Sequence, residues 1–146
     1  HLLCLLTYKG RGYTPDFTLN FNRIVRRLAR GEQAMIVEGA DDICRPMLCQ
    51  SAFHCADSHT YEIDKQALAD ISRLLGDDLT YGQTIVFDAH NVKQLRQAFI
   101  SGEIRTACQT CSWQTQCDDI AQHHFHDTRL IPPAAAGRRI AVTQVL

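Results

Sequence analysis

The chain has 146 residues, of which 15 are Lys or Arg and 16 are Asp or Glu, so its formal net charge is −1. This balance provides no excess of basic residues for binding nucleic acid, and no apolar run approaches the length of a membrane span. The chain holds seven cysteines, an odd number without an export signal, which favours a thiol or metal protein of the cytoplasm over a disulfide scaffold.

An apolar run from His1 to Leu6 opens the chain and carries Cys4. The run is too short for the core of an export signal and lacks a basic flank, so we expect it to be buried. The chain begins with His1 and not with Met, so we expect the true N-terminus to lie upstream. The glycine-rich segment from Lys9 to Tyr13 is predicted to be a turn.

The first predicted helix has Thr14 as its N-cap and Pro15 at its first position, and it ends at Gly31. Its apolar residues recur at helical spacing, which indicates one buried face. That face consists of Phe17, Phe21, Ile24, Val25 and Leu28. A short strand is predicted from Ala34 to Val37.

A loop containing Asp41, Asp42 and Cys44 follows this strand, and the chain from there to His59 is dense in metal-ligating side chains. These side chains are Cys44, Cys49, His54, Cys55, Asp57 and His59. The spacing Cys44-x4-Cys49-x5-Cys55 matches no closed metal site by itself, so we interpret the segment as the source of a fourth ligand or as half of a second site.

Two more helices are predicted, one from about Thr60 to Leu75 and one that starts after the N-cap Asp88 and ends at Gly102. The segment from Asp77 to Phe87 between them is expected to be a loop or an irregular strand. A short helix is expected to start near Asp118.

Cys108, Cys111 and Cys117 form the densest thiol run of the chain, with the spacing C-x2-C-x5-C. The first two thiolates can bind one metal from a single tight turn, and the third returns at the next helix start. The intervening residues are polar, apart from Trp113, which we interpret as a packing lid over the sulfur atoms. Three thiolates are one short of a tetrahedral sulfur site, so one of Cys4, Cys44, Cys49 or Cys55 is expected to complete the set.

These elements predict a mostly α domain, or a small α+β one, of three to five helices with a minor strand element and cysteine-rich metal-binding loops. We place this domain at residues 1–127 and interpret residues 128–146 as a linker and C-terminal tail, because the Pro- and Ala-rich segment from Leu130 to Gly137 breaks the pattern. Three histidines lie just before that boundary, at His123, His124 and His126. We interpret them as part of an exposed helix end, with a labile metal site as the alternative.

Four segments, in this order, resemble the bacterial and archaeal family called domain of unknown function 1284. They are His1-Leu-Leu-Cys4, Gly10-x-Gly12-Tyr13, Asp41-Asp42-Ile43-Cys44 and Cys108-x2-Cys111-x-Trp113-x3-Cys117. The resemblance covers roughly residues 1 to 125. It implies an iron–sulfur protein and no particular activity, and it raises Cys4 and Cys44 as partners of the C-terminal thiols.

The resulting hypothesis is a [4Fe–4S] cluster bound by Cys108, Cys111, Cys117 and one further thiol, with Cys44 as first choice and Cys4 and Cys55 as alternatives. Such a protein would serve electron transfer or another redox role with an unidentified redox or protein partner. A structural zinc module is the first alternative, because the same thiols suit zinc. A small metalloenzyme is the second, and its spare ligands would be Cys49, His54 and His59.

Overall fold

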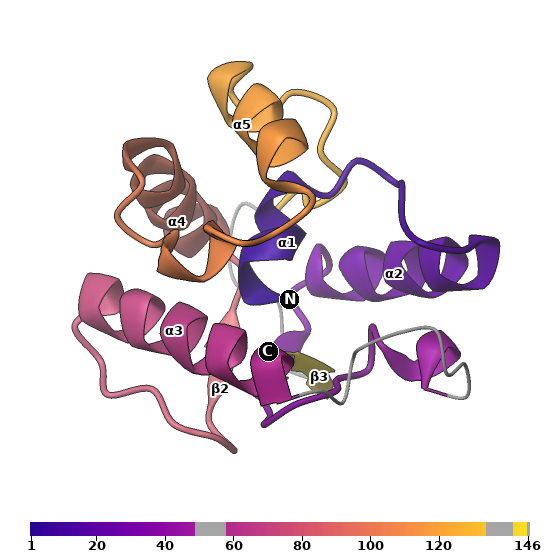
Figure 1. Cartoon of the computed structure of the whole chain (residues 1–146), viewed down its shortest axis with the longest axis horizontal. Helices are drawn as coiled ribbons and strands as arrows, with labels where there is room; N and C mark the ends of the chain where they lie inside the picture. Colours follow the sequence, from indigo (N-terminus) through magenta and orange to yellow (C-terminus); the bar gives the residue numbers. More distant parts are fainter. Residues whose placement is uncertain (49–57, 134–141, 146) are drawn as a thin grey trace.

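The computed structural model describes residues 1–48, 58–133 and 142–145. Within these ranges the chain forms five α-helices, two single-turn 3-10 helices and one three-stranded sheet (Figure 1). The helices are α1 (Leu2–Thr7), α2 (Pro15–Leu28), α3 (Ser58–Leu75), α4 (Ala89–Ser101) and α5 (Gln114–Gln122). The 3-10 helices are η1 (Arg45–Met47) and η2 (Thr106–Cys108), and the strands are β1 (Gln33–Ile36), β2 (Thr84–Val86) and β3 (Val142–Val145). The predicted fold class, mostly α with a minor strand element, is confirmed.

Helix α1 lies in the middle of the molecule, with α2, α4 and α5 around it (Figure 1). Leu2, Leu5 and Leu6 are at most 1% exposed, so this single short helix is apolar on most of its surface and belongs to the core. It packs directly against α4 and α5. The leucines of the apolar run at the start of the chain are therefore buried, as predicted, while Cys4 is the exposed residue of α1.

Helix α2 begins and packs as its sequence predicts. The hydroxyl of Thr14 accepts a hydrogen bond of 3.1 Å from the backbone N–H of Phe17, and Pro15 occupies the first turn. All five residues of the predicted apolar face are buried. After the helix, Gly31 has a φ of 89°, a left-handed conformation that favours glycine.

Helices α3 and α4 also match their predicted ranges to within two residues. The side chain of Asp88 caps α4 by accepting a 2.8 Å hydrogen bond from Asn91 N–H, and Gly102 ends it with a φ of 83°. Helix α3 contributes Ala67, Leu68 and Ile71 to the core, but it also buries Asp64 and Asp70, which the sequence pattern did not single out. The two buried carboxyl groups are the unexpected feature of this helix.

The sheet has the strand order β2-β1-β3, in which β2 runs antiparallel and β3 parallel to β1. Strand β3 was not predicted, because residues 128–146 were interpreted as a linker and tail. Thr128 and Leu130, in the same interval, are also buried. The predicted domain boundary at residue 127 is not otherwise tested, and residues 134–141 and 146 lie outside the described ranges.

Strand β3 also contacts the chain that leaves β1. Val37 N–H donates a 3.3 Å hydrogen bond to the carbonyl of Val145, and Asp42 N–H donates one of 3.1 Å to the carbonyl of Gln144. The backbone N–H of Gln144 in turn donates a 3.0 Å bond to the carboxylate of Asp42. The loop that carries Asp41 and Cys44 is thus held by the last described residues of the chain.

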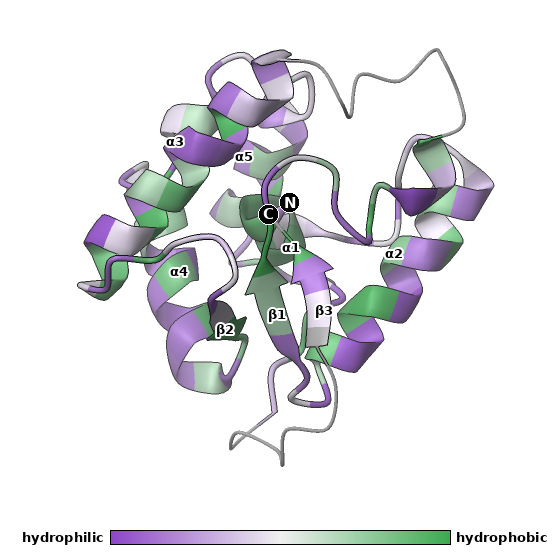
Figure 2. Ribbon diagram, turned by 90° about the horizontal axis from the view of Figure 1, so that it is seen from below, coloured by the Kyte–Doolittle hydropathy of each residue, from purple (hydrophilic) through white to green (hydrophobic). Residues whose placement is uncertain are grey.

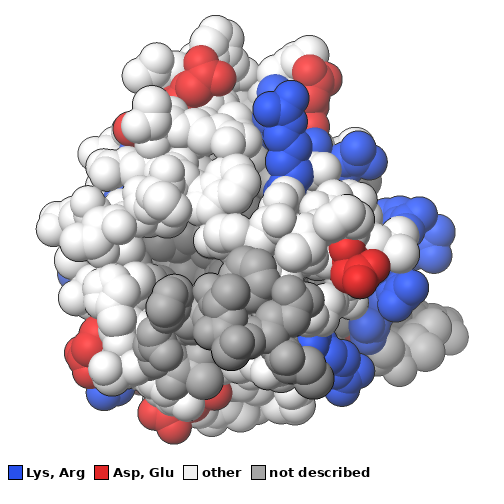
Figure 3. Space-filling view, turned by 45° about the vertical axis from the view of Figure 1, so that its right-hand side comes forward, with Lys and Arg blue, Asp and Glu red and all other residues white. Residues whose placement is uncertain are grey.

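The sheet lies between helices on both sides in the view of Figure 2, and β1 is its hydrophobic centre. No helix of the described ranges is long and apolar enough to cross a membrane. The face drawn in Figure 3 is mostly uncharged, and its Lys and Arg side chains gather toward one edge.

Candidate metal centre

The three cysteines of the C-terminal run lie on successive turns of the backbone. Cys108 ends η2, and its carbonyl accepts a 3.1 Å hydrogen bond from Cys111 N–H. Cys117 lies in α5, where its N–H donates a 3.0 Å bond to the carbonyl of Trp113. All three side chains are half-buried. Each short interval therefore returns the backbone to the same region, and the binding of one metal or cluster by these three thiols stays a prediction.

Cys4 joins this region from the other end of the chain. One turn after Cys4 on α1, the hydroxyl oxygen of Thr7 lies 3.3 Å from the sulfur of Cys117. Cys4, Thr7 and Cys117 also line one cavity of about 90 Å³. We therefore define the four-thiol site as Cys4, Cys108, Cys111 and Cys117.

The thiols of this site influence one another electrostatically. Burial, and after it the charge of Cys4, raise the pKa of Cys108 to about 11, although a hydrogen bond from Arg105 opposes the rise. Burial likewise raises the pKa of Cys117, while the Thr7 hydroxyl lowers it. The Cys4 side chain is exposed to the cavity, yet the protein around it desolvates its thiol and raises that pKa too. Without a cation these groups stay protonated, whereas a bound metal ion deprotonates coordinating thiols.

Arg105 is the basic group next to the site. Its guanidinium pairs with the Asp118 carboxylate at 2.5 Å and lies over the ring of Phe99, 4.4 Å from the centroid. These contacts fix the cation beside Cys108. Arg45, the other cation that lies near a candidate ligand in the sequence, is exposed in η1.

Trp113 lies at the aromatic side of the cavity. Its indole N–H donates a 3.0 Å hydrogen bond to the Tyr13 hydroxyl, and the two rings meet edge to face at 5.6 Å. Both rings line the cavity together with Cys4 and Cys117. This position agrees with the interpretation of Trp113 as a packing residue beside the sulfur atoms.

Cys44 lies in a different group, with His1 and Asp41. The Nδ1 atom of His1 is 2.8 Å from Asp41 Oδ2 and 3.8 Å from Cys44 Sγ. Cys44 and Asp41 are buried, and the side chain of His1 is 22% exposed. Among the described residues, these are the only three ligand atoms of His, Cys, Asp or Glu that all lie within 4.8 Å of one another. We call this group the His1–Asp41–Cys44 triad.

The triad carries an unusual set of charges. Burial lowers the pKa of His1, but the Asp41 charge and hydrogen bonds with Asp41 and Cys44 raise it more, so the net pKa lies well above its ordinary value. Asp64 of α3 also acts on His1 and Asp41, and burial raises its own pKa to about 7. Sequence reasoning missed His1, Asp41 and Asp64, although His1 and Asp41 occur in the family-like segments quoted above.

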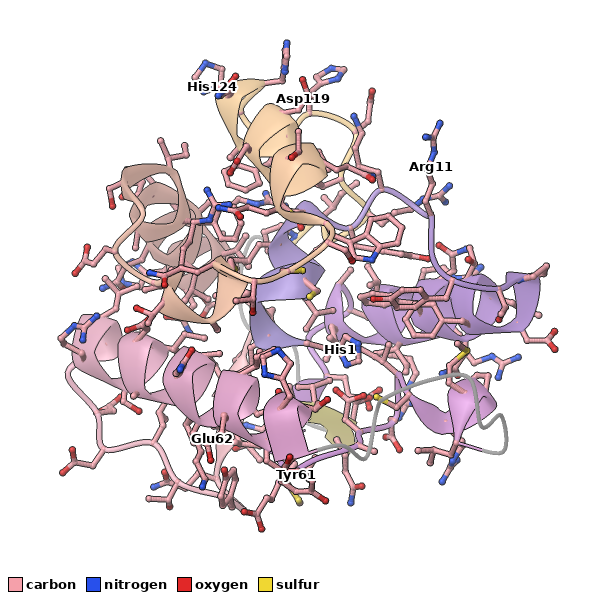
Figure 4. All side chains as sticks on the ribbon, in the orientation of Figure 1. His1, Arg11, Tyr61, Glu62, Asp119 and His124 are labelled. Carbon is pink, nitrogen blue, oxygen red and sulfur yellow. The ribbon has the colours of Figure 1, made fainter. Side chains whose placement is uncertain are left out.

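Some predicted ligands lie outside the described residues, and others lie on the surface away from the two ligand groups. Cys49, His54, Cys55 and Asp57 lie outside the described residues, so the roles predicted for Cys49 and Cys55 stay predictions. His59 is exposed on α3. The imidazoles of His123 and His126 pair with Asp119 and Asp127, at 3.3 and 3.0 Å, on an exposed surface. Figure 4 shows Asp119 and His124 at the outer end of α5, far from His1.

The fold and the two ligand groups define a small, mostly α domain with clustered thiols and a candidate metal site. A family model described as protein of unknown function (DUF1284) matches residues 12–117, and the chain therefore belongs to this family. No curated protein and no solved structure matches the chain significantly.

Proposed function

We propose that this protein binds a [4Fe–4S] cluster through Cys4, Cys108, Cys111 and Cys117 and uses it for electron transfer or another redox reaction. The observation that carries the proposal is the convergence of α1 with the C-terminal cysteine run. Cys4 and Cys117 come from opposite parts of the sequence and line the same cavity. Four cysteine thiolates are the usual ligand set of such a cluster.

The choice of Cys4 as fourth ligand, in place of our first choice Cys44, rests on position. The charge of Cys4 acts on the thiols of Cys108 and Cys117. Cys44 contacts His1, and its backbone N–H donates to Asp41. Because Cys44 has partners of another kind, we assign it to the triad.

The surroundings of the four-thiol site suit a negatively charged cluster. Arg105 supplies a positive charge, and Thr7 supplies a hydroxyl donor. The aromatic rings of Tyr13 and Trp113 line the cavity beside the thiols. Hydrogen bonds, nearby charge and solvent exposure are the protein's means of setting a cluster's reduction potential.

A redox role also needs a path for electrons to a partner. Cys4 is exposed to the cavity, so one side of the site is close to solvent. A structural zinc ion held by the same thiols is the second candidate, because four cysteines also form closed zinc sites. No three of these four sulfur atoms lie within 4.8 Å of one another, so a zinc ion would have to draw them closer together. In that case the protein would be redox-silent and would act as an interaction module.

The test is anaerobic purification of the full chain, followed by metal and sulfide analysis and a visible spectrum. We expect about four irons and four sulfides per chain and a broad absorbance near ~400 nm that bleaches on reduction. One zinc per chain in a colourless protein would replace the cluster with the structural zinc site. A chain with neither metal after anaerobic isolation and reconstitution with iron and sulfide would refute both candidates.

A further inference from the structure

The His1–Asp41–Cys44 triad combines an imidazole, a carboxylate and a thiol, three different ligand types on side chains that come from two separate segments. His1 precedes α1, and Asp41 and Cys44 lie in the loop before η1. Figure 4 shows His1 in the interior, where α1, α2 and the start of α3 meet. The triad shares no ligand with the four-thiol site, although His1 and Cys4 line the same cavity and their charges interact.

The surrounding contacts hold the triad in position. One carboxylate oxygen of Asp41, Oδ1, accepts hydrogen bonds of 2.9 and 3.1 Å from the backbone N–H groups of Ile43 and Cys44. This arrangement directs the other oxygen, Oδ2, to His1. The His1 ring packs against Phe17 and Phe21 of α2, with ring centroids 6.2 and 6.0 Å away. Ligands fixed in this way lose little conformational freedom when a metal ion binds.

The distances are close to those of a tetrahedral zinc site. With a Zn–N distance of about 2.05 Å and a Zn–S distance of about 2.3 Å, ligand nitrogen and sulfur lie about 3.6 Å apart. The observed separation of His1 Nδ1 and Cys44 Sγ is 3.8 Å. A nitrogen and a carboxylate oxygen bound to one zinc ion lie about 3.4 Å apart. The observed distance between His1 Nδ1 and Asp41 Oδ2 is 2.8 Å. An ion would therefore replace the proton between His1 and Asp41 with a movement of well under ~1 Å.

The charge of the region favours a cation. Asp41 and Asp64 are both buried, 4% and 8% exposed, and lie within electrostatic range of each other. Buried carboxylates are stable as anions only beside a positive charge or a metal ion. The His1 imidazole supplies one such charge only while it is protonated, whereas a divalent cation would balance the charges of the Asp41 carboxylate and the Cys44 thiolate that bind it.

We propose that His1, Asp41 and Cys44 form a second metal site, for a single divalent cation of the zinc type. Mixed nitrogen, oxygen and sulfur ligands suit zinc, which is borderline in its ligand preference. Three protein ligands leave a fourth position for water or a small molecule, as in catalytic zinc sites. Of the three ligands, His1 lines the same 90 Å³ cavity as Cys4, which gives a small molecule a route to the imidazole side of the site.

Cobalt(II) is the probe for this site, because it replaces zinc and becomes coloured when a thiolate binds it. The full chain is purified anaerobically, treated with a chelator that removes divalent ions, checked for unchanged iron and titrated with cobalt(II). We expect one cobalt per chain with a thiolate-to-cobalt charge-transfer band. Cys44→Ser should remove the band and Asp41→Asn should weaken binding by roughly 10–100-fold or more, while both variants keep their iron.

Asp41→Asn is the decisive variant, because an amide oxygen can still accept the bonds from Ile43 and Cys44 N–H. Its matched control is Asp42→Asn, which removes the same charge from the neighbouring residue outside the triad. Circular dichroism would show that each variant is folded. Equal cobalt affinity in Asp41→Asn and Asp42→Asn would overturn the proposal. So would an absence of cobalt binding in the wild type, or a band lost in Cys108→Ser but retained in Cys44→Ser.

This test is independent of the four-thiol proposal. If iron is absent but the cobalt band depends on Cys44, the triad is a metal site and the cluster proposal fails. If iron is present but the cobalt band does not depend on Cys44 or Asp41, the cluster proposal stands and the triad is only an ion pair beside a thiol.

Discussion

The Thr7 hydroxyl lies 3.3 Å from the sulfur of Cys117, although the two residues are 110 positions apart in the sequence. As a thiol, Cys117 can donate to this oxygen while the hydroxyl donates to the carbonyl of Cys4, 3.4 Å away. As a metal-bound thiolate, Cys117 can only accept, so the Thr7 hydroxyl must turn to the sulfur. This contact joins the helix that carries Cys4 to the helix that carries Cys117.

Thr7→Val keeps the shape of the side chain and removes the hydroxyl. If a hydrogen bond of about 0.5–1.5 kcal/mol favours the reduced cluster, its loss lowers the reduction potential by about 20–65 mV for one electron. Redox titration of the visible absorbance measures the shift. Thr7→Ser retains the donor and is expected to stay near the wild-type potential, and an unchanged potential in Thr7→Val would show that the hydroxyl does not reach the cluster.

Cys4→Ser and Cys44→Ser form a matched pair that identifies the fourth thiol ligand. We expect Cys4→Ser to lose iron and soluble yield, as Cys108→Ser, Cys111→Ser and Cys117→Ser should, because a three-thiolate site lacks one ligand. Cys44→Ser should retain its iron. Iron and sulfide assays on anaerobic preparations measure the cluster content of the two variants. Loss of iron in Cys44→Ser and its retention in Cys4→Ser would instead identify Cys44 as the fourth ligand, which was the first choice from the sequence.

Arg105→Gln removes the positive charge beside Cys108. For a charge about 5–10 Å away in a medium of effective dielectric constant near 20, the interaction is about 1.7–3.3 kcal/mol, or about 70–140 mV. The potential should fall by roughly this amount, because a cation stabilises the more negative, reduced state. Arg105→Lys keeps the charge and should recover most of the loss. A fall of similar size in both variants would instead assign the effect to the packing on Phe99.

Asp64→Asn should change the pH dependence of stability in protein stripped of divalent ions. Burial raises the pKa of Asp64 from 3.8 to about 7, so the folded state binds the proton more tightly than the unfolded state. Its contribution to the free energy of unfolding is therefore complete below about pH 4 and is lost as the pH rises to 7, a change of up to about 4 kcal/mol.

Asparagine does not titrate, so the variant should be more stable than the wild type at pH 8 and much closer to it at pH 5. Thermal unfolding at the two pH values measures the difference. Glu62→Gln, an exposed charge on the same helix, is the control and should show little pH-dependent difference. A parallel shift of Asp64→Asn at both pH values would contradict the prediction.

The helices were predictable because their start and stop signals are local. Thr14 and Asp88 cap the helices that follow them, and Gly102 ends α4, all within a few residues of the apolar pattern. Strand β3 has no comparable signal. Val142 pairs with Gln33 of β1, which is distant in the sequence, so this strand forms only because of a tertiary contact.

The candidate site, like the fold, was predictable only where its residues lie close together in the sequence. The tight turns between Cys108 and Cys117 follow from the short spacing of the run, whereas the role of its thiols as ligands stays a prediction. The relation of Cys4 to that run depends on how α1 packs against α5, and no local pattern encodes that packing. His1 and Asp41 are 40 positions apart, so their pairing became evident only in the folded chain.

The bonds between β3 and the loop around Asp42 also affect when the protein can acquire metal during its synthesis. The segment carrying Asp41 and Cys44 leaves the ribosome well before Gln144 and Val145, the two β3 residues whose hydrogen bonds hold that segment. The four-thiol site likewise cannot form before Cys117 has been synthesised. We therefore expect metal to be loaded only after β3 has been synthesised, so a chain that stalls before β3 would expose several reactive thiols with no ion to protect them.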